Sequence, residues 1–177
     1  AISGLPPYVT YYLRVGPLNW GGAGNYTVLG ATVPTTFKSV PLGGGIGASH
    51  GVAWGDYDGD GDLDAIVAIL SAANQAVYRN DGSGLLTPVT LAGTDGDARG
   101  VAWGDYDNDG DLDALVAIVG GGESFILRHD AFDAFTKVAV PGAGGNAYAA
   151  AWGDLDNDGD LDGLLAKTAN ADEVLLR

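Results

Sequence analysis

A 49-residue internal repeat limits what this chain can fold into more than any other feature of its sequence. Two residue types mark the repeat at the same spacing: Trp54, Trp103 and Trp152, and Arg79, Arg128 and Arg177. A repeat of this length indicates an array of similar units, because each unit buries its apolar face only against its neighbours. The array covers residues 36–177, which leaves residues 1–35 as a separate segment.

Each unit contains the same parts in the same order. A short alternating stretch at 37–42, 86–91 and 135–140 is followed by a Gly-rich connection, a VAWGD or AAWGD segment, an Asp-rich loop, an apolar run and a stretch ending in Arg. These parts predict four short strands per unit, with Gly, Asn and Asp at the turns. The apolar runs at 65–70 and 114–119 suit strands buried on both faces. A helix is the alternative for such runs, but the Gly, Val and Ile content favours strands.

Four strands in a unit of this length are typical of a β-propeller blade. We therefore predict an all-β fold of three four-stranded repeats, and an incomplete ring because three blades are too few to close one. Residues 37–42 match the outer fourth strand of a blade whose first three strands are absent, and the chain stops after the third strand of the last unit. Unpaired edges of this kind invite strand addition, either from further sequence or from another copy.

The Asp-rich loop of each unit has carboxylates at every second position. The loops read DYDGDGDLD at 56–64, DYDNDGDLD at 105–113 and DLDNDGDLD at 154–162. Like charges at this spacing repel, which predicts a bound cation that neutralises them. Alternating oxygens around a Gly that turns with positive φ are typical of a Ca²⁺ loop, and a flexible oxygen-rich loop favours Ca²⁺ over Mg²⁺. The candidate metal ligands are Asp56, Asp58, Asp60, Asp62, Asp64, Asp105, Asp107, Asp109, Asp111, Asp113, Asp154, Asp156, Asp158, Asp160 and Asp162.

An EF-hand is the obvious alternative, but that loop needs a bidentate Glu at position twelve. The twelfth positions here are Val67, Val116 and Leu165, so the ninth-position Asp has to close each loop. The seventh position would offer its backbone carbonyl. A plain Asp/Gly hairpin turn is a second alternative, and an ion that only stiffens the hairpin is a third.

The segment WGDYDNDGDLDALVA resembles the FG-GAP and VCBS repeats, the blades of integrin-α-type propellers. The resemblance covers about four-fifths of the chain. It implies that each Asp loop joins the first and second strands of a blade and binds one Ca²⁺, with the aspartates above as ligands. The departure from the family is the small number of blades.

Residues 1–35 resemble the last part of a fibronectin type III domain, a partial β-sandwich segment. Leu5 and Pro7 open the segment, Tyr11 stands in the tyrosine-corner position, and Asn19 to Gly24 form the hairpin turn. The earlier strands of that sandwich are missing, which favours a fragment of a longer protein. A hairpin packed on the first blade is the alternative. Asn25 begins a glycosylation sequon.

Composition excludes several classes of function. The net charge of −15 and only 8 Lys and Arg argue against nucleic acid as a partner. There is no cysteine for disulfides or thiolate catalysis, and no stretch has the length of a membrane span. His50 and His129 do not recur and lack an obvious nucleophile, so we predict no enzyme activity. The repeated Trp residues predict packing between blades, and the repeated Arg residues predict pairing with nearby acids.

The sequence therefore predicts a calcium-binding, extracellular propeller segment, secreted or at the cell surface, that serves adhesion, recognition or assembly. The partners would be a protein or glycan at the cell surface, or further copies of the chain. The variable Gly-rich connections at 43–49, 92–97 and 141–146 are the candidate partner surfaces. Two alternatives stay open: a structural subunit of a filament or sheath joined by strand exchange, and an accessory propeller of a larger secreted enzyme.

Overall fold

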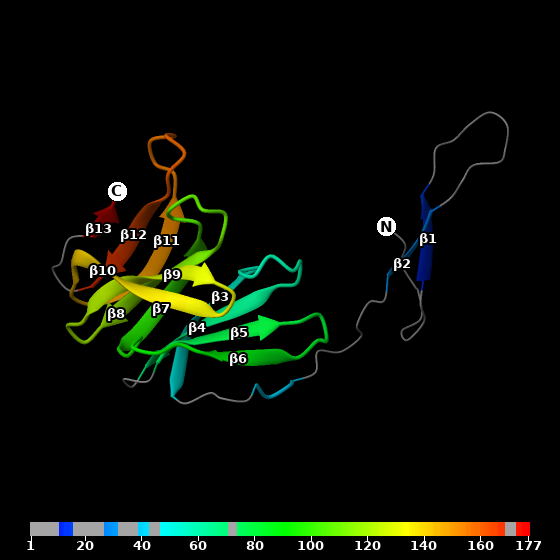
Figure 1. Cartoon of the computed structure of the whole chain (residues 1–177), viewed down its shortest axis with the longest axis horizontal. Coiled ribbons are helices and arrows are strands. Elements are labelled where there is room, and N and C mark those ends of the chain that lie inside the picture. The colour runs from blue at the N-terminus through cyan, green and yellow to red at the C-terminus, as the bar shows by residue number, and fades with distance from the viewer. Residues whose placement is uncertain (1–10, 16–26, 32–38, 43–46, 71–73, 169–172) are drawn as a thin grey trace. The chain divides into compact units, whose positions relative to one another are not determined.

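A computed structural model of the chain describes residues 11–15, 27–31, 39–42, 47–70, 74–168 and 173–177 (Figure 1). The chain divides into two units, Ala1–Pro41 and Leu42–Arg177. All regular structure in the described residues is β-strand, which confirms the predicted all-β class. Within these residues no helix is long and apolar enough to cross a membrane.

The first unit contains one antiparallel pair, β1 (Tyr11–Val15) and β2 (Thr27–Ala31). Their register pairs Tyr11 with Ala31 and Val15 with Thr27. Tyr11, the expected tyrosine-corner residue, is therefore the first residue of β1. The other residues behind the fibronectin-like interpretation, Leu5, Pro7, Asn19 to Gly24 and the Asn25 sequon, lie outside the described residues.

The second unit is built from three antiparallel sheets whose strands follow chain order. The first sheet contains β3 (Ala48–Gly55), β4 (Asp64–Leu70), β5 (Ala76–Asn80) and β6 (Leu86–Thr90). The second contains β7 (Asp97–Gly104), β8 (Asp113–Val119), β9 (Glu123–Ala131) and β10 (Ala134–Gly144). The third contains β11 (Ala147–Gly153), β12 (Asp162–Lys167) and β13 (Val174–Leu176). Four strands per repeat are thus present in the first two sheets and three in the last.

The predicted outer strand at 37–42 has no counterpart in the part that the structure describes. Residues 39–42 are in no strand, and residues 37 and 38 are outside the described ranges. An outer strand pairs with the third strand of its own blade, and the repeat pattern includes no such strand before residue 37. The three sheets also form no closed ring among the described residues, as expected for so few repeats.

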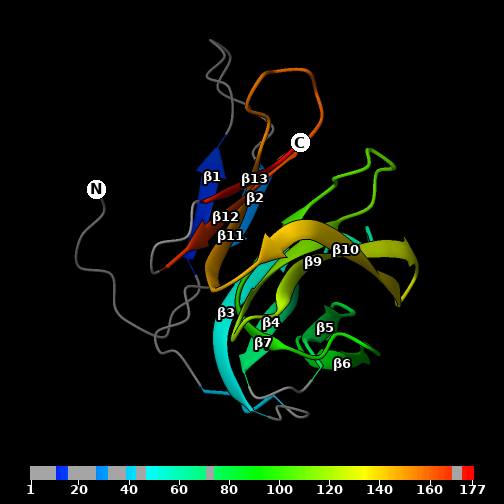
Figure 2. The same ribbon diagram turned by 90° about the vertical axis from the view of Figure 1, so that its left-hand side faces the viewer.

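The second strand of each of the first two sheets carries the core. Every residue from Asp64 to Ile66 in β4 and from Asp113 to Ile118 in β8 is buried, because these central strands have a neighbour on each side and a sheet on at least one face. This confirms the strands predicted from the apolar runs. Figure 2 turns the third sheet toward the viewer and shows the strong twist of the long pair β9 and β10 beside it.

The sheets pack through their first strands, with β7 between β3 and β11. Glycines allow this close approach: a Cβ on Gly51 would lie 2.7 Å from the Arg99 carbonyl oxygen, and one on Gly100 would lie 2.7 Å from the Ala149 Cα. Trp103 lies in the core between the first two sheets and Trp152 in the core between the last two. The predicted packing role is therefore confirmed for these two tryptophans. It is wrong for Trp54, which is 59% exposed because no other sheet of the second unit packs against that face of the first one.

Candidate metal centres

Each Asp loop joins the first strand of a sheet to the second. The first loop leaves β3 after Gly55 and enters β4 at Asp64, and the other two occupy the same place in their sheets. The ninth aspartate of each loop is therefore the first residue of a central strand. The resemblance implied this placement, and it fixes one carboxylate on the most rigid part of the sheet.

Two positions in every loop turn with positive φ. The sixth position is Gly61, Gly110 or Gly159, with φ between 93° and 98°, as predicted from the spacing. The fourth position also turns, with φ of 72° at Gly59, 58° at Asn108 and 60° at Asn157. Gly and Asn are the residues that tolerate this conformation. The sequence carried that second indication, since only Gly and Asn occur at position four.

Three of the five carboxylates in each loop converge. The first, third and ninth aspartates each offer an oxygen, and the three oxygens lie within 4.8 Å of one another in every loop. The groups are Asp56, Asp58 and Asp64; Asp105, Asp107 and Asp113; and Asp154, Asp156 and Asp162. Three hard oxygens in a cluster of this size can hold one divalent cation, with waters or carbonyls completing its shell.

The ninth aspartate is held by the backbone. Asp64 accepts hydrogen bonds from Tyr57 N (3.0 Å) and Asn80 N (2.8 Å), and Asp113 accepts them from Tyr106 N (3.1 Å) and His129 N (2.8 Å). In the third loop Asp162 accepts one from Leu155 N at 2.8 Å. These bonds orient the carboxylate toward the loop.

The fifth and seventh aspartates lie outside the converging groups. The fifth accepts a hydrogen bond from the backbone N–H of the seventh: Asp60 from Asp62 (2.9 Å), Asp109 from Asp111 (3.0 Å) and Asp158 from Asp160 (2.9 Å). Two seventh-position side chains face neighbours instead. Asp111 lies 4.0 Å from His129 Nδ1, and Asp160 accepts a bond from Asn108 Nδ2 of the preceding loop at 2.6 Å. The five predicted ligands of each loop thus fall into two groups. The side chains at positions one, three and nine converge, whereas those at positions five and seven lie outside the cluster.

Burial makes the gathered carboxylates costly to ionise without a partner. Desolvation raises the pKa of Asp113 to about 6, in spite of the two backbone N–H groups that favour its charged form. The same cause raises the pKa values of Asp58 and Asp64. A bound cation would reverse this effect, because it favours the ionised carboxylate.

One carboxylate oxygen of the first loop has no hydrogen-bond partner. Asp56 Oδ2 accepts a bond from Gly61 N at 3.0 Å, whereas Asp56 Oδ1 is buried and has none. An unpaired buried oxygen costs about 1–3 kcal/mol, more when it is charged. A cation held by the first loop would supply the missing partner, so the residues present fit a hard divalent ion.

The repeated arginines pair with acidic residues, as predicted, but the partner acids of Arg177 occupy different repeat positions from those of Arg79 and Arg128. Arg79 binds Asp81 (2.8 Å) and Asp133 (2.5 Å), and Arg128 binds Asp130 at 2.7 Å, away from the gathered carboxylates. Arg177 instead lies beside the third loop, 3.7 Å from Asp156 and 3.9 Å from Asp162. The third site therefore already has a positive charge at its edge.

A link between the first two sheets was not predicted. The Tyr57 hydroxyl donates to Asp133 at 2.6 Å, and the Tyr57 ring stacks on Trp103 at 5.9 Å and meets the edge of His129 at 5.2 Å. The second position of the first loop is thereby locked into the core that it shares with the second sheet. Asp133 belongs to the turn between β9 and β10 and does not recur, so no repeat pattern pointed to it.

One comparison with known proteins finds a match. Residues 66–116 match the family model described as FG-GAP-like repeat. The match runs from β4 through the second Asp loop into β8, less than a third of the chain. No curated protein matches the chain.

Proposed function

We propose that the second unit is a calcium-binding segment of an integrin-α-type propeller, exposed outside the cell, that presents a rigid surface for adhesion or recognition. The observation that carries this is the threefold recurrence of one geometry: an aspartate triad within 4.8 Å at the same place in three sheets. The FG-GAP-like match over the second loop supports it. Millimolar calcium, as found outside cells, suits weak repeated sites of this kind.

In this proposal the bound ion has a structural role. Bound Ca²⁺ neutralises the triad and fixes the loop between the first two strands of each sheet. The chain's own residues hold the ninth carboxylate in place and turn the loop at positions four and six. The connections between sheets then present variable residues to a protein or glycan, with no catalytic role for the unit. The first unit remains a proposed fibronectin type III-like segment, to which the β1–β2 pair lends support.

The direct test is a calcium titration followed by calorimetry. Three sites per chain are expected in the wild type, and Asp107→Asn should remove the second one. Asp95→Asn is the matched control, because Asp95 is exposed and outside the loops. Absence of calcium binding at millimolar concentration, or equal loss in both variants, would contradict the proposal.

A structural subunit is the second candidate, and the open edge of the third sheet favours it. In the described residues this sheet ends at β13 and has three strands where the other two have four. Such an edge can accept a strand from another chain. An accessory role in a larger secreted enzyme would require a catalytic domain on the same polypeptide, which intact-mass analysis and sequencing of the secreted product would reveal.

A further inference from the structure

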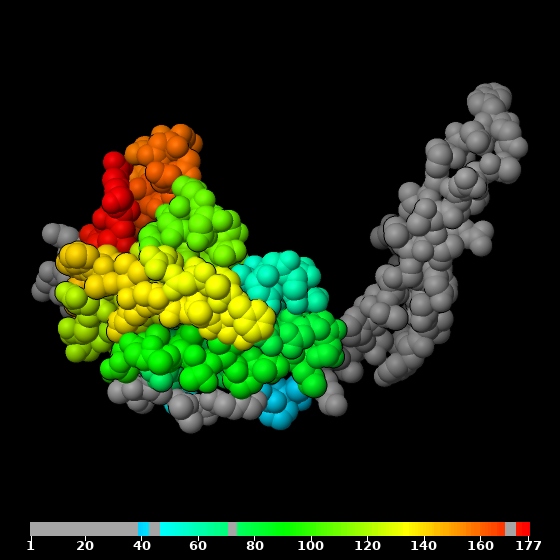
Figure 3. All heavy atoms as spheres, in the orientation of Figure 1, coloured from blue at the N-terminus to red at the C-terminus, as the bar shows by residue number. Residues whose placement is uncertain are grey.

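The first and third sheets of the second unit each expose one apolar face. The equivalent faces at the joints between sheets are covered by the neighbouring sheet. On the third sheet Leu155 is 59% exposed and Leu164 is 47% exposed, and Leu175 is exposed beside them. Their counterparts one repeat earlier are partly or fully covered: Tyr106, Leu115 and Ile126. On the first sheet the exposed residues are Val52, Trp54 and Leu63. In Figure 3 the orange and red atoms of the third sheet lie at the outer edge of the unit.

The joints inside the chain follow one rule. The glycine that ends the first strand of a sheet receives a Trp and a Leu from the following sheet. A Cβ on Gly55 would lie 2.8 Å from Trp103 Cδ1 and 2.9 Å from Leu112 Cδ1. A Cβ on Gly104 would lie 2.6 Å from Trp152 Cδ1 and 2.9 Å from Leu161 Cδ1. Each joint therefore needs a bare glycine on one side and a Trp–Leu pair on the other.

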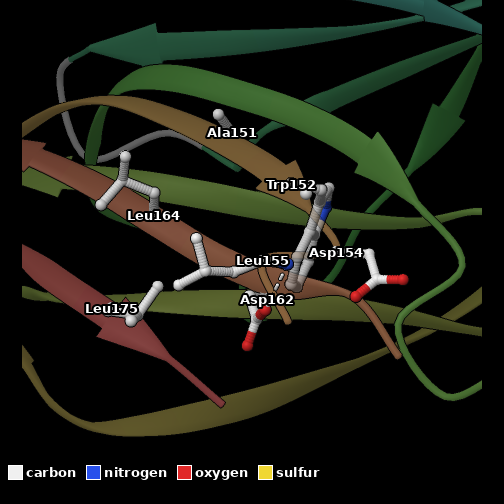
Figure 4. A pocket seen from close by; sticks show the side chains of 8 residues that line it. Ala151, Trp152, Asp154, Leu155, Asp162, Leu164 and Leu175 are labelled. Carbon is white, nitrogen blue, oxygen red and sulfur yellow. Dashed lines mark hydrogen bonds between the residues drawn. The ribbon is translucent and has the colours of Figure 1, made fainter. Parts of the chain in front are cut away.

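Gly153 is the corresponding glycine of the third sheet, and nothing lies within 4 Å of its Cβ position. A hollow of about 280 Å³ opens there, lined by Trp152, Leu155, Leu164 and Leu175 together with the carboxylates Asp154 and Asp162. Figure 4 shows the three leucine side chains directed into this hollow beside the Trp152 ring. Like the surfaces that receive a Trp–Leu pair in the two internal joints, the hollow combines apolar side chains with loop carboxylates. It has Leu155 where those surfaces have Tyr57 and Tyr106, which stack on the incoming Trp rings.

We propose that the hollow at Gly153 receives Trp54 and Leu63 of a second copy of this chain. Of the three Trp–Leu pairs of the repeat, only this one contacts no strand-ending glycine in the described residues. Of the three strand-ending glycines, only Gly153 contacts no Trp–Leu pair there. The joint between copies is then a third example of the joint already present twice in one chain. Such an interface is heterologous, because one face meets a different face of the partner.

Two polar contacts of the joint between the second and third sheets extend to the new one. The joint between the first and second sheets has neither, because Trp103 Nε1 is buried without a partner and position 59 is Gly. Trp152 Nε1 donates to the Ala102 carbonyl oxygen at 3.2 Å, and the equivalent bond would run from Trp54 Nε1 to Ala151 of the second copy. Asn108 Nδ2 donates to Asp160 of the next loop at 2.6 Å, and the equivalent bond would join Asn157 to Asp62. Two copies of the 177-residue chain used in the experiment below would bring six sheets together, within the 4–8 blades of closed propellers, so a two-copy assembly is the product expected in that experiment.

This proposal concerns the end faces and goes beyond the proposed calcium function, since it does not require that the loops hold an ion. It also differs from strand exchange, because sheets stack face to face and no strand changes partner. The mass of the assembly and the calcium titration are separate measurements, so either proposal can fail without the other.

The experiment is sedimentation equilibrium of the 177-residue chain at physiological salt with calcium, over concentrations up to about 1 mM, the limit of weak specific association. The wild type should approach twice its 17.9 kDa mass. Trp54→Glu changes one face and Gly153→Leu fills the other, and each variant alone should stay monomeric. An equimolar mixture of the two should form a dimer, because one intact face of each kind is then available.

Leu85→Glu is the control, since Leu85 is exposed on the β5–β6 turn and in neither face. It should associate as the wild type does, and circular dichroism should show that all variants are folded. A wild type that remains monomeric to about 1 mM would overturn the proposal. Dimers that persist in both Trp54→Glu and Gly153→Leu would also overturn the proposal, and so would an equimolar mixture of the two variants that stays monomeric. In each case the hollow at Gly153 would have to be covered by something other than a second copy of this chain.

Discussion

The second and third sheets have closely similar sequences and different surroundings. The second has a neighbour on both faces, and its central strand β8 is buried from Asp113 to Ile118. The third has a neighbour on one face, and Leu164 and Leu175 of its other face are exposed. The comparison shows that the repeat defines one kind of joint, while the position of a unit in the array decides whether its side chains are core or surface.

Replacement of one equivalent leucine in each sheet tests this difference most strongly. Leu115→Ala in β8 should lower the free energy of unfolding by about 2–5 kcal/mol, because it leaves a cavity in a packed core. Leu164→Ala, at the same position one repeat later, should cost about 0.5 kcal/mol or less in the monomer. Urea denaturation at low protein concentration measures both. Similar losses would show that the third sheet is covered as fully as the second.

A methyl group added to the equivalent glycines tests the joint itself. Gly104→Ala should destabilise the fold by about 1–3 kcal/mol, because the new Cβ would lie 2.6 Å from the Trp152 ring. Gly153→Ala should leave the thermal midpoint of the monomer nearly unchanged, since no atom lies near that Cβ position. A large loss in Gly153→Ala would mean that the hollow is filled in solution by part of the same chain.

The pH dependence of stability should differ between the metal-free wild type and Asp113→Asn. The pKa of Asp113 is about 6 in the folded chain and about 3.9 when unfolded, so the folded state binds the proton more tightly. The free energy of unfolding should therefore fall as pH rises from about 4 to about 6, then level off. The variant lacks this titration and should show a smaller fall, although Asp64 contributes in the same direction. Denaturation in calcium-free buffer across this range is the measurement; equal slopes would contradict the burial argument.

The smallest expected effect separates the second and third metal sites. Arg177 lies beside Asp156 and Asp162, whereas Arg128 is paired with Asp130. Arg177→Gln should raise the calcium affinity of the third site by about 1.4–5-fold, the range for an exposed ion pair of about 0.2–1 kcal/mol. Arg128→Gln should leave the second site unchanged. Calorimetric titration distinguishes these outcomes, and a lower third-site affinity in Arg177→Gln would show that Arg177 supports the loop.

Part of the candidate metal site was predictable from the sequence, since alternating carboxylates and a turning glycine leave few loop conformations. The spacing placed Asp64, Asp113 and Asp162 at the head of a strand, and the structure agrees. It did not separate the three aspartates that converge from the two that do not. That separation depends on backbone N–H groups, such as those of Asn80 and His129, which belong to a different strand.

Apart from the strand expected at 37–42, the sequence by itself determined the strands of the second unit, their order within each sheet and the position of the loops, because these follow from the 49-residue repeat and a local period of two. Only the tertiary structure decided which copy of each repeated residue is buried. Trp54 and Trp103 have the same local sequence, VAWGDYD, and Trp152 a closely similar one, yet Trp54 is largely exposed while the other two lie in cores between sheets. The physical reason is that apolar burial depends on what lies opposite a residue, and the first and third sheets each have one face against which no other sheet of the second unit packs.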